Sequence, residues 1–118
     1  MDWDLLLPSR DAENVARINA LLADELDVPL ETLGPHGENV IQTYQTRWGI
    51  LQFHLGRPPG MEAFDVLEAR AKEHLIANGV VAKCLNGKDL LASKRAVNRP
   101  SDFEDIEFLE AKAQAGLL

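Results

Sequence analysis

Cysteine is almost missing from this sequence, since Cys84 is the only one among 118 residues. A single thiol cannot close an internal disulfide, so the sequence does not predict a disulfide-stabilised secreted domain. The chain also lacks an apolar run of the roughly 18 residues that a membrane span needs. No positively charged segment precedes a hydrophobic signal stretch. We therefore expect a cytoplasmic protein without membrane association, in a reducing compartment.

Basic side chains are scarce as well. The chain has 12 lysines and arginines against 19 aspartates and glutamates, which gives a net charge of −7. This charge has the wrong sign for a protein that nucleic acid would hold through its overall field, so we expect no bulk nucleic-acid binding. A phosphate-bearing ligand would need a metal ion or a local cluster of basic residues.

The remaining composition is that of an ordinary globular protein, with 46% hydrophobic and 26% charged residues. A length of 118 residues suits one domain with its own core, so we expect residues 1–118 to form a single domain. The sequence shows no internal repeat and no low-complexity tract.

The first half of the chain predicts strands around one helix. Residues 2–7 are short, apolar and followed by Pro8, which is typical of a buried strand. Ser9 is placed to cap a helix, whose apolar residues recur at helical spacing. These are Ala12, Val15, Ile18, Leu22 and Leu26. Residues 28–37 hold two prolines and two glycines and predict a loop, while 38–47 fit either a strand or a short helix.

The second half predicts a hairpin followed by helices. Residues 50–55 alternate like a half-buried strand, and 61–67 form the second arm after the turn Gly56-Arg57-Pro58-Pro59-Gly60. One or two helical turns over 68–74 and a short strand at 79–82 follow. Helices are predicted over 88–97 and from Ser101, where Ser101 and Glu104 have the spacing of a capping box. The expected buried stripe of the last helix is Phe103, Ile106, Leu109 and Ala113.

Three aspartates are the candidate metal ligands. Asp2 and Asp4 would project from one face of the first strand, roughly 7 Å apart. Asp65, within Ala63-Phe64-Asp65-Val66-Leu67, could join them if its strand lies beside the first. Three convergent carboxylates would hold Mg²⁺ or Mn²⁺ and, through it, the phosphates of a nucleotide. The alternative is that Asp2 and Asp4 are polar residues at a frayed terminus and that Asp65 faces solvent.

Lys94, Arg95 and Arg99 form the best local basic cluster of this acidic protein. Lys94 could offset phosphate charge, and Arg99 could grip an oxyanion through two parallel hydrogen bonds. The alternative is structural, with Arg99 pairing with Asp102 or Asp105 to lock the turn between the last two helices. We favour the structural role for Arg99 and keep both roles open for Lys94.

The remaining candidates predict no site. His36, His54 and His74 lie in unrelated contexts, and none pairs with Cys84 at a zinc-ligand spacing, so we interpret them as ordinary surface or strand residues. No Gly-rich phosphate loop of the Walker or dinucleotide type is present.

Three segments together resemble the nucleotidyltransferase superfamily. Asp2-Trp3-Asp4-Leu5-Leu6-Leu7 is similar to its paired-aspartate strand, and Leu55-Gly56-Arg57-Pro58-Pro59-Gly60 leading into Phe64-Asp65-Val66-Leu67 is similar to the hairpin of its third aspartate. The most specific run is Asp89-Leu90-Leu91-Ala92-Ser93-Lys94-Arg95-Ala96 with Arg99-Pro100-Ser101-Asp102-Phe103-Glu104-Asp105-Ile106. It resembles the closing signature of small bacterial members related to the abortive-infection toxin nucleotidyltransferases.

The resemblance implies an α+β fold in which a small mixed β-sheet packs against helices. It also implies that Asp2, Asp4 and Asp65 bind Mg²⁺ or Mn²⁺ with a nucleoside triphosphate, that Lys94 stabilises phosphate charge, and that a nucleoside monophosphate is transferred. In the family a Gly-Gly or Gly-Ser turn before the paired aspartates holds the phosphates. Here the chain begins at Met1, directly before Asp2, so we expect a domain shortened at its N-terminus.

Two functions of different class follow from the resemblance. The first is a nucleotidyltransferase-like protein with a Mg-nucleotide site, weak or inactive alone because the phosphate-binding turn is absent. The second is a non-catalytic relative that keeps the fold and acts by oligomerisation or partner binding. Without a neighbour on one side, the first strand would leave an apolar sheet edge, for which we expect pairing into a homo-oligomer.

Overall fold

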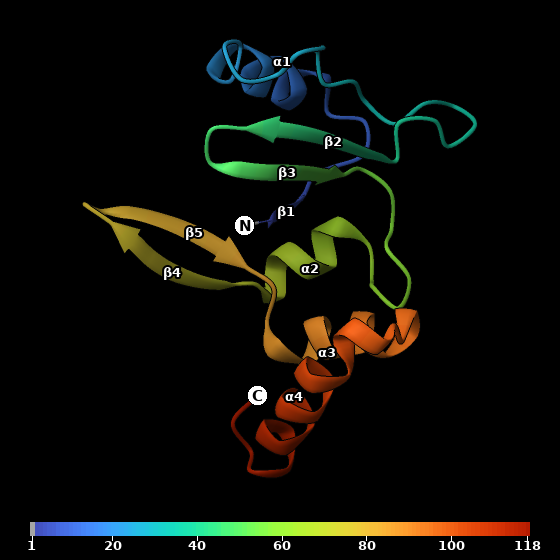
Figure 1. Cartoon of the computed structure of the whole chain (residues 1–118), viewed down its shortest axis with the longest axis vertical. Coiled ribbons are helices and arrows are strands. Elements are labelled where there is room, and N and C mark those ends of the chain that lie inside the picture. Colours follow the sequence, from blue (N-terminus) through green and yellow to red (C-terminus); the bar gives the residue numbers. More distant parts are fainter. Residues whose placement is uncertain (1) are drawn as a thin grey trace. The chain divides into compact units, whose positions relative to one another are not determined.

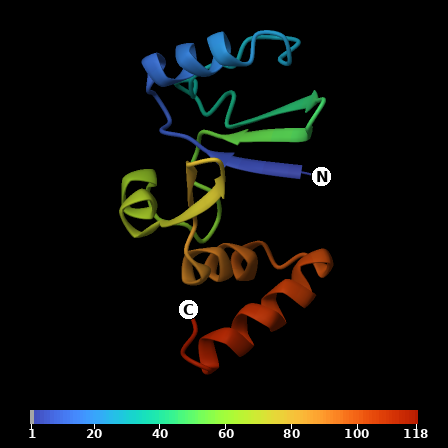
Figure 2. The same ribbon diagram turned by 90° about the vertical axis from the view of Figure 1, so that its left-hand side faces the viewer.

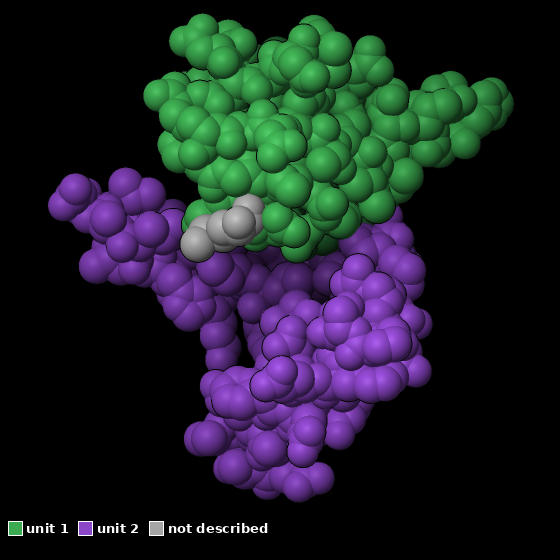
Figure 3. Space-filling view, in the orientation of Figure 1, with its two compact units in different colours: residues 1–56 green, residues 57–118 purple. Residues whose placement is uncertain are grey.

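The computed structural model describes residues 2–118 and shows an α+β protein, in agreement with the expected class. Its contacts divide the chain into two compact units, residues 1–56 and 57–118 (Figure 3). Each unit has its own helices and strands, and each is described by itself below.

The first unit is built on a three-stranded mixed sheet. Strands β1 (Asp2–Leu6) and β3 (Gly49–His54) pair in parallel, and β2 (Ile41–Thr46) pairs antiparallel with β3, so the order is β1-β3-β2. The predicted strands at 2–7 and 50–55 are confirmed, and the ambiguous segment 38–47 contains a strand. Parallel strands need a long crossover connection, which here contains helix α1 (Ala12–Leu21), the loop after it and β2.

Helix α1 begins two residues later than a Ser9 cap would place it. Asp11 is the N-cap, and its side chain accepts a hydrogen bond from the backbone N–H of Asn14 at 3.0 Å. The proposed Ser9 cap is therefore wrong. The helix ends before Leu22, yet Leu22 and Leu26 still pack against the core from the turn that follows. The apolar spacing thus identified the buried residues and overestimated the length of the helix.

One face of the sheet carries the core of the first unit. In both ribbon views α1 is drawn beside β2, on the side away from β1 (Figures 1 and 2). Leu51 and Phe53 of β3 are buried on the core face with Tyr44 of β2, whose ring meets Phe53 edge to face at a centroid distance of 5.8 Å. Val15 reaches the same cluster from α1. Because side chains alternate along a strand, the residues between these positions point to the opposite face.

Two side-chain amides tie the predicted loop at 28–37 to the first unit. Asn19 donates to the carbonyl oxygen of Leu30 and accepts from its N–H, at 2.9 and 2.8 Å. Gln42 makes the same pair of bonds with the backbone of Glu31, at 2.8 and 2.9 Å. Each amide replaces a strand neighbour that the loop lacks, so both backbone groups of Leu30 and of Glu31 are satisfied.

The second unit begins with helix α2 (Phe64–Arg70), where a strand over 61–67 is predicted; that prediction is wrong. Phe64 and Leu67 are three residues apart, and Leu67 is the buried residue of the helix. Asp65 in the first turn and Arg70 in the last have the signs that the helix dipole favours. The chain then forms a separate hairpin instead of one shared with β3.

This hairpin consists of β4 (Lys72–Ala77) and β5 (Val80–Cys84). The predicted strand at 79–82 is confirmed in substance. The helical turns predicted over 68–74 are correct for 68–70, which end α2, and wrong for 72–74, which begin β4. Asn78 and Gly79 form the connection with φ values of 48° and 80°, which suits the two-residue turn of a tight hairpin. Every residue of β4 is exposed.

The C-terminal helices are α3 (Gly87–Val97) and α4 (Phe103–Gln114), joined by the 3₁₀ turn η1 (Pro100–Asp102). Asn86 caps α3, and Asn98 ends it in the left-handed conformation. The capping box is wrong, because Ser101 lies inside the 3₁₀ turn and no side chain caps α4 in the described chain. Leu91 and Leu109 are buried, whereas Phe103 is 53% exposed, so the predicted stripe is only partly correct.

Among residues 2–118, no helix is long and apolar enough to cross a membrane.

Candidate functional site

Asp2 and Asp4 lie on the face of β1 that points away from the core of the first unit. Their register partners on β3 are Ile50 and Gln52, and both aspartates are exposed. Paired positions on neighbouring strands place their side chains on the same face. The strand therefore holds its two carboxylates as the sequence predicts, on one side of the ladder.

Polar side chains of β2 and β3 continue this face. Gln52 stands between Asp4 on β1 and Thr43 on β2, since it is the register partner of both. His54 follows two residues later on β3, and its Nε2 lies 3.0 Å from Oδ1 of Asp4. We call Asp2, Asp4, Gln52 and His54 the polar sheet face. It brings together two carboxylates, one amide and one imidazole from strands that are about 50 residues apart in sequence.

Gln52 and His54 were missed as site residues in the sequence. The alternation of residues 50–55 does put them on the polar side of their strand, opposite Leu51 and Phe53. Their relation to the N-terminal aspartates depends on the parallel pairing of β1 with β3, which no local pattern encodes. His54, interpreted as an ordinary strand residue, is the partner of Asp4.

Asp65 has a different setting from the predicted one. It lies in the first turn of α2, in the second unit, and not on a strand of a hairpin with β3. The strand-to-strand relation that was to bring it beside Asp2 and Asp4 is therefore absent. In the described part of the chain, no group of three or more histidine, cysteine, aspartate or glutamate side chains is placed to hold a metal ion.

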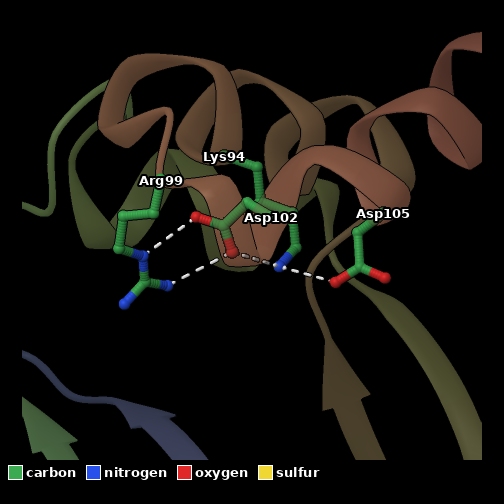
Figure 4. A network of polar contacts seen from close by, with 4 residues as sticks. All are labelled: Lys94, Arg99, Asp102 and Asp105. Carbon is green, nitrogen blue, oxygen red and sulfur yellow. Dashed lines mark hydrogen bonds and ion pairs between the residues drawn. The ribbon is translucent and has the colours of Figure 1, made fainter.

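The predicted basic residues Lys94 and Arg99 meet at the turn between α3 and α4 (Figure 4). Arg99 donates from Nε to Oδ2 of Asp102 at 2.9 Å and from a terminal nitrogen to Oδ1 at 3.3 Å. Lys94 reaches Oδ1 of Asp102 at 3.3 Å and Oδ2 of Asp105 at 3.2 Å. Asp102, which is 3% exposed, thus has two cationic partners. This is the structural arrangement that the sequence analysis favours for Arg99, and it includes Lys94 as well.

The network shifts two pKa values in the directions that stabilise ion pairs. The hydrogen bonds from Arg99 lower the pKa of Asp102, and they outweigh the burial that would raise it. Burial by itself lowers the pKa of Lys94, but the hydrogen bonds to Asp105 and Asp102 outweigh it, and the pKa is raised. Both groups therefore keep their charges, and the positive charge of Lys94 is directed at carboxylates of its own unit.

The donors of the polar sheet face can be compared with the needs of the implied metal. Mg²⁺ prefers oxygen ligands and often uses only one or two protein carboxylates, with phosphates and water completing its shell. Asp2, Asp4 and the amide oxygen of Gln52 offer this chemistry, and both carboxylates are exposed. The donor set therefore fits a metal that also binds a nucleotide, and it does not need Asp65.

Comparisons of the chain with protein-family models, with curated protein sequences and with solved structures find no match.

Proposed function

We propose that this chain is a nucleotidyltransferase-like protein whose polar sheet face binds a divalent metal together with a nucleoside triphosphate, with little or no transfer activity alone. The observation that carries the proposal is the placement of Asp2 and Asp4 on one exposed face of β1, directly beside the polar residues of β3. The resemblance in the sequence supports the ligand class, and the strand geometry supports the choice of Asp2 and Asp4.

Each residue of the face has a role in this proposal. Asp2 and Asp4 contribute carboxylate oxygens to the metal, and Gln52, the register partner of Asp4, adds an amide oxygen. When bound, the metal neutralises and orients the phosphates of the nucleotide. The core beneath the sheet fixes the spacing of these side chains, because Leu51 and Phe53 alternate with Gln52 on β3 and are buried.

The proposal expects low transfer activity because the basic residues that could stabilise the phosphates already have carboxylate partners. Lys94 and Arg99, the residues proposed to stabilise phosphate charge, are engaged by Asp102 and Asp105. A net charge of −7 adds repulsion for a triphosphate. The metal would then carry most of the charge compensation, which supports binding better than transfer.

Titration calorimetry tests the proposal with Mg²⁺ or Mn²⁺ and each nucleoside triphosphate in turn. We expect heat of binding that is lost in Asp2→Ala and Asp4→Ala. Asp24→Ala is the matched control, because it removes an exposed carboxylate from the turn after α1. We expect Asp65→Ala to keep the heat, since its position at the start of α2 removes the argument for a ligand role. No heat from any metal and nucleotide pair at millimolar concentration would refute the proposal.

The second candidate is a non-catalytic protein that acts by self-association, and the sheet edges favour it. β1 has one strand neighbour, β3, in the described sheet, so its outer backbone groups lie at an edge. Unpaired edges promote pairing with another chain. Light scattering coupled to gel filtration over a range of concentrations measures this directly. A homo-oligomer is expected, and a monomer at every concentration would reject this candidate.

A further inference from the structure

The hairpin of β4 and β5 has little support from the rest of the second unit. Every residue of β4 is exposed, and in β5 only Ala82 is half-buried. The contacts of the two strands are chiefly with each other, and the turn of the hairpin is directed away from α2, α3 and α4 (Figure 1). The described chain adds no third strand to this sheet. A two-stranded hairpin is only marginally stable in water, so this one needs a further neighbour.

We infer that this neighbour is a second copy of the chain, with β5 pairing antiparallel to β5 of the second copy about a two-fold axis at Ala82. The two hairpins then form one four-stranded sheet in the order β4-β5-β5-β4. The inference rests on the self-association candidate above and deepens it, because it assigns the contact to β5 instead of the edge of β1. It does not depend on nucleotide binding.

β5 is the strand of the hairpin whose edge is open to pairing. On β4, Ile76 has no register partner, because the pairing shifts between Leu75 and Ala77. A bulge of this kind bends a strand and protects its edge. β4 also begins with a lysine and a glutamate, and charged side chains discourage edge pairing. All five residues of β5 have register partners, and Lys83 is its one charged residue.

The backbone of the hairpin fixes the register of the contact. Ala77 and Val80 are register partners on either side of a two-residue turn, so their backbone groups bond to each other. Bonded and non-bonded positions alternate along an antiparallel ladder. Val81 and Lys83 therefore direct their N–H and C=O groups away from β4. With the axis at Ala82, each Val81 lies opposite Lys83 of the second copy, and these pairs exchange their outward hydrogen bonds.

The side chains of β5 suit pairing with an identical strand. The two Ala82 residues face each other at the axis as a non-bonded pair, with Cα atoms about 4.5 Å apart, and a small side chain fits this close approach. The two Lys83 residues lie diagonally, and each has Glu73 as its register partner on β4. An axis at Lys83 would instead place like charges directly opposite each other, which is destabilising. The register at Ala82 thus satisfies the outward backbone groups and keeps the lysines apart.

The apolar area of the hairpin indicates a weak dimer. Four of its aliphatic side chains are between 52% and 72% exposed, namely Leu75, Ile76, Val80 and Val81. Full burial of such a side chain removes on the order of 100 Å² from water, so two hairpins bring roughly 500 Å² of apolar surface to the contact. A stable interface buries about 1,200 Å² or more in total. The dimer is therefore concentration-dependent, and its detection needs a method that traps it.

Cysteine cross-linking traps the dimer and reports its register. Ala82→Cys in a Cys84→Ser background should form a disulfide between copies under mild oxidation, because a Cα distance of about 4.5 Å lies in the range that a disulfide spans. Val81→Cys in the same background is the matched control. Its counterpart lies diagonally, roughly 7–8 Å away, which is too far for a disulfide. Non-reducing electrophoresis should show at least about ten times more dimer for Ala82→Cys.

A second pair of variants tests the contact without added cysteines. Val81→Lys places a lysine directly opposite Lys83 of the second copy, and it should weaken dimerisation about tenfold in light scattering over a range of concentrations. Leu75→Lys is the matched control, since Leu75 is the register partner of Val81 on β4 and is 72% exposed. It should leave the dimer nearly unchanged, because β4 lies outside the contact.

The outcomes separate this inference from the self-association candidate. Equal cross-linking of Ala82→Cys and Val81→Cys overturns the inference, as does a dimer that Leu75→Lys weakens as much as Val81→Lys. Self-association that persists unchanged in Val81→Lys, without cross-linking of Ala82→Cys, overturns the inference and leaves the candidate with the edge of β1. A chain that stays monomeric and does not cross-link through Ala82→Cys refutes both. Should Ala82→Cys fail to fold by circular dichroism, the two lysine variants decide.

Discussion

The side-chain amides of Asn19 and Gln42 each make two hydrogen bonds to one loop residue, and we call them the amide clamps. They allow a test of how burial sets the cost of a lost hydrogen bond. Asn19→Ala removes both partners of the backbone of Leu30, a residue that is only 2% exposed. Leaving a buried donor or acceptor unsatisfied costs about 1–3 kcal/mol. Two such groups, with the half-buried position of Asn19 giving water some access, lead to an expected loss of about 2–4 kcal/mol.

Gln42→Ala is the matched comparison. It removes the same two kinds of bond from Glu31, but these bonds lie at exposed positions where water can replace the amide. We expect a loss of about 1 kcal/mol or less, which is the net value of an exposed hydrogen bond. Each variant removes one amide that bonds to a loop residue 11 positions away. Gln42→Ala also removes the hydrogen bond from Gln42 to the carbonyl oxygen of Asn39 at 3.0 Å, so a smaller loss for this variant would arise despite one more lost bond.

Urea unfolding followed by tryptophan fluorescence measures both losses. The two tryptophans of the chain, Trp3 and Trp48, lie in the first unit, so their emission reports the unit that carries the clamps. A loss of about 2–4 kcal/mol is a large share of the 5–15 kcal/mol typical of a folded domain. Equal losses for Asn19→Ala and Gln42→Ala, with equal slopes against urea, would refute the reasoning that burial decides the cost.

Two further predictions concern the second unit. Gly60→Ala should destabilise it by more than Gly79→Ala in thermal unfolding followed by circular dichroism. Both glycines have positive φ, which costs another residue about 1–2 kcal/mol, but only at Gly60 would the new Cβ come within 2.6 Å of the carbonyl oxygen of Ala92. Acid unfolding should differ between the wild type and Asp102→Asn. Because the pKa of Asp102 is lowered in the folded state, its stabilising contribution is present above the ordinary carboxyl pKa and is lost as the pH falls through the folded value, so the two unfolding curves should converge at low pH. A constant difference between them down to strongly acidic pH would contradict this account.

Local patterns predicted those parts of the fold whose partners are close in sequence or whose burial is complete. The alternation at 50–55 gave both the strand β3 and its buried face, and the run 88–97 gave α3 almost to the residue. At 61–67 the pattern failed because a short apolar segment fits a strand or a helix equally well by periodicity. In the structure this segment begins the helix α2, with Asp65 in its first turn, Arg70 in its last and Leu67 buried.

Only the part of the candidate site that depends on local strand geometry could be predicted from the sequence. That Asp2 and Asp4 share a face follows from strand geometry alone. That Asp4 contacts His54 follows from a parallel register between strands 50 residues apart, which depends on the whole first unit. The predicted placement of Asp65 was wrong because the predicted strand over 61–67 is partly the helix α2, and a helical residue pairs with no neighbouring strand.

Many basic side chains of this acidic protein are engaged by its own carboxylates. Within residues 2–118, six of the 12 lysines and arginines form ion pairs with carboxylates of their own unit. These are Arg47, Arg70, Lys83, Lys94, Arg95 and Arg99. Moving Arg99 or Lys94 to a phosphate would leave the buried carboxylate of Asp102 with one cation fewer, and an uncompensated buried charge is costly. Under the proposed function, the metal at the polar sheet face supplies the positive charge that Lys94 and Arg99 already give to Asp102 and Asp105.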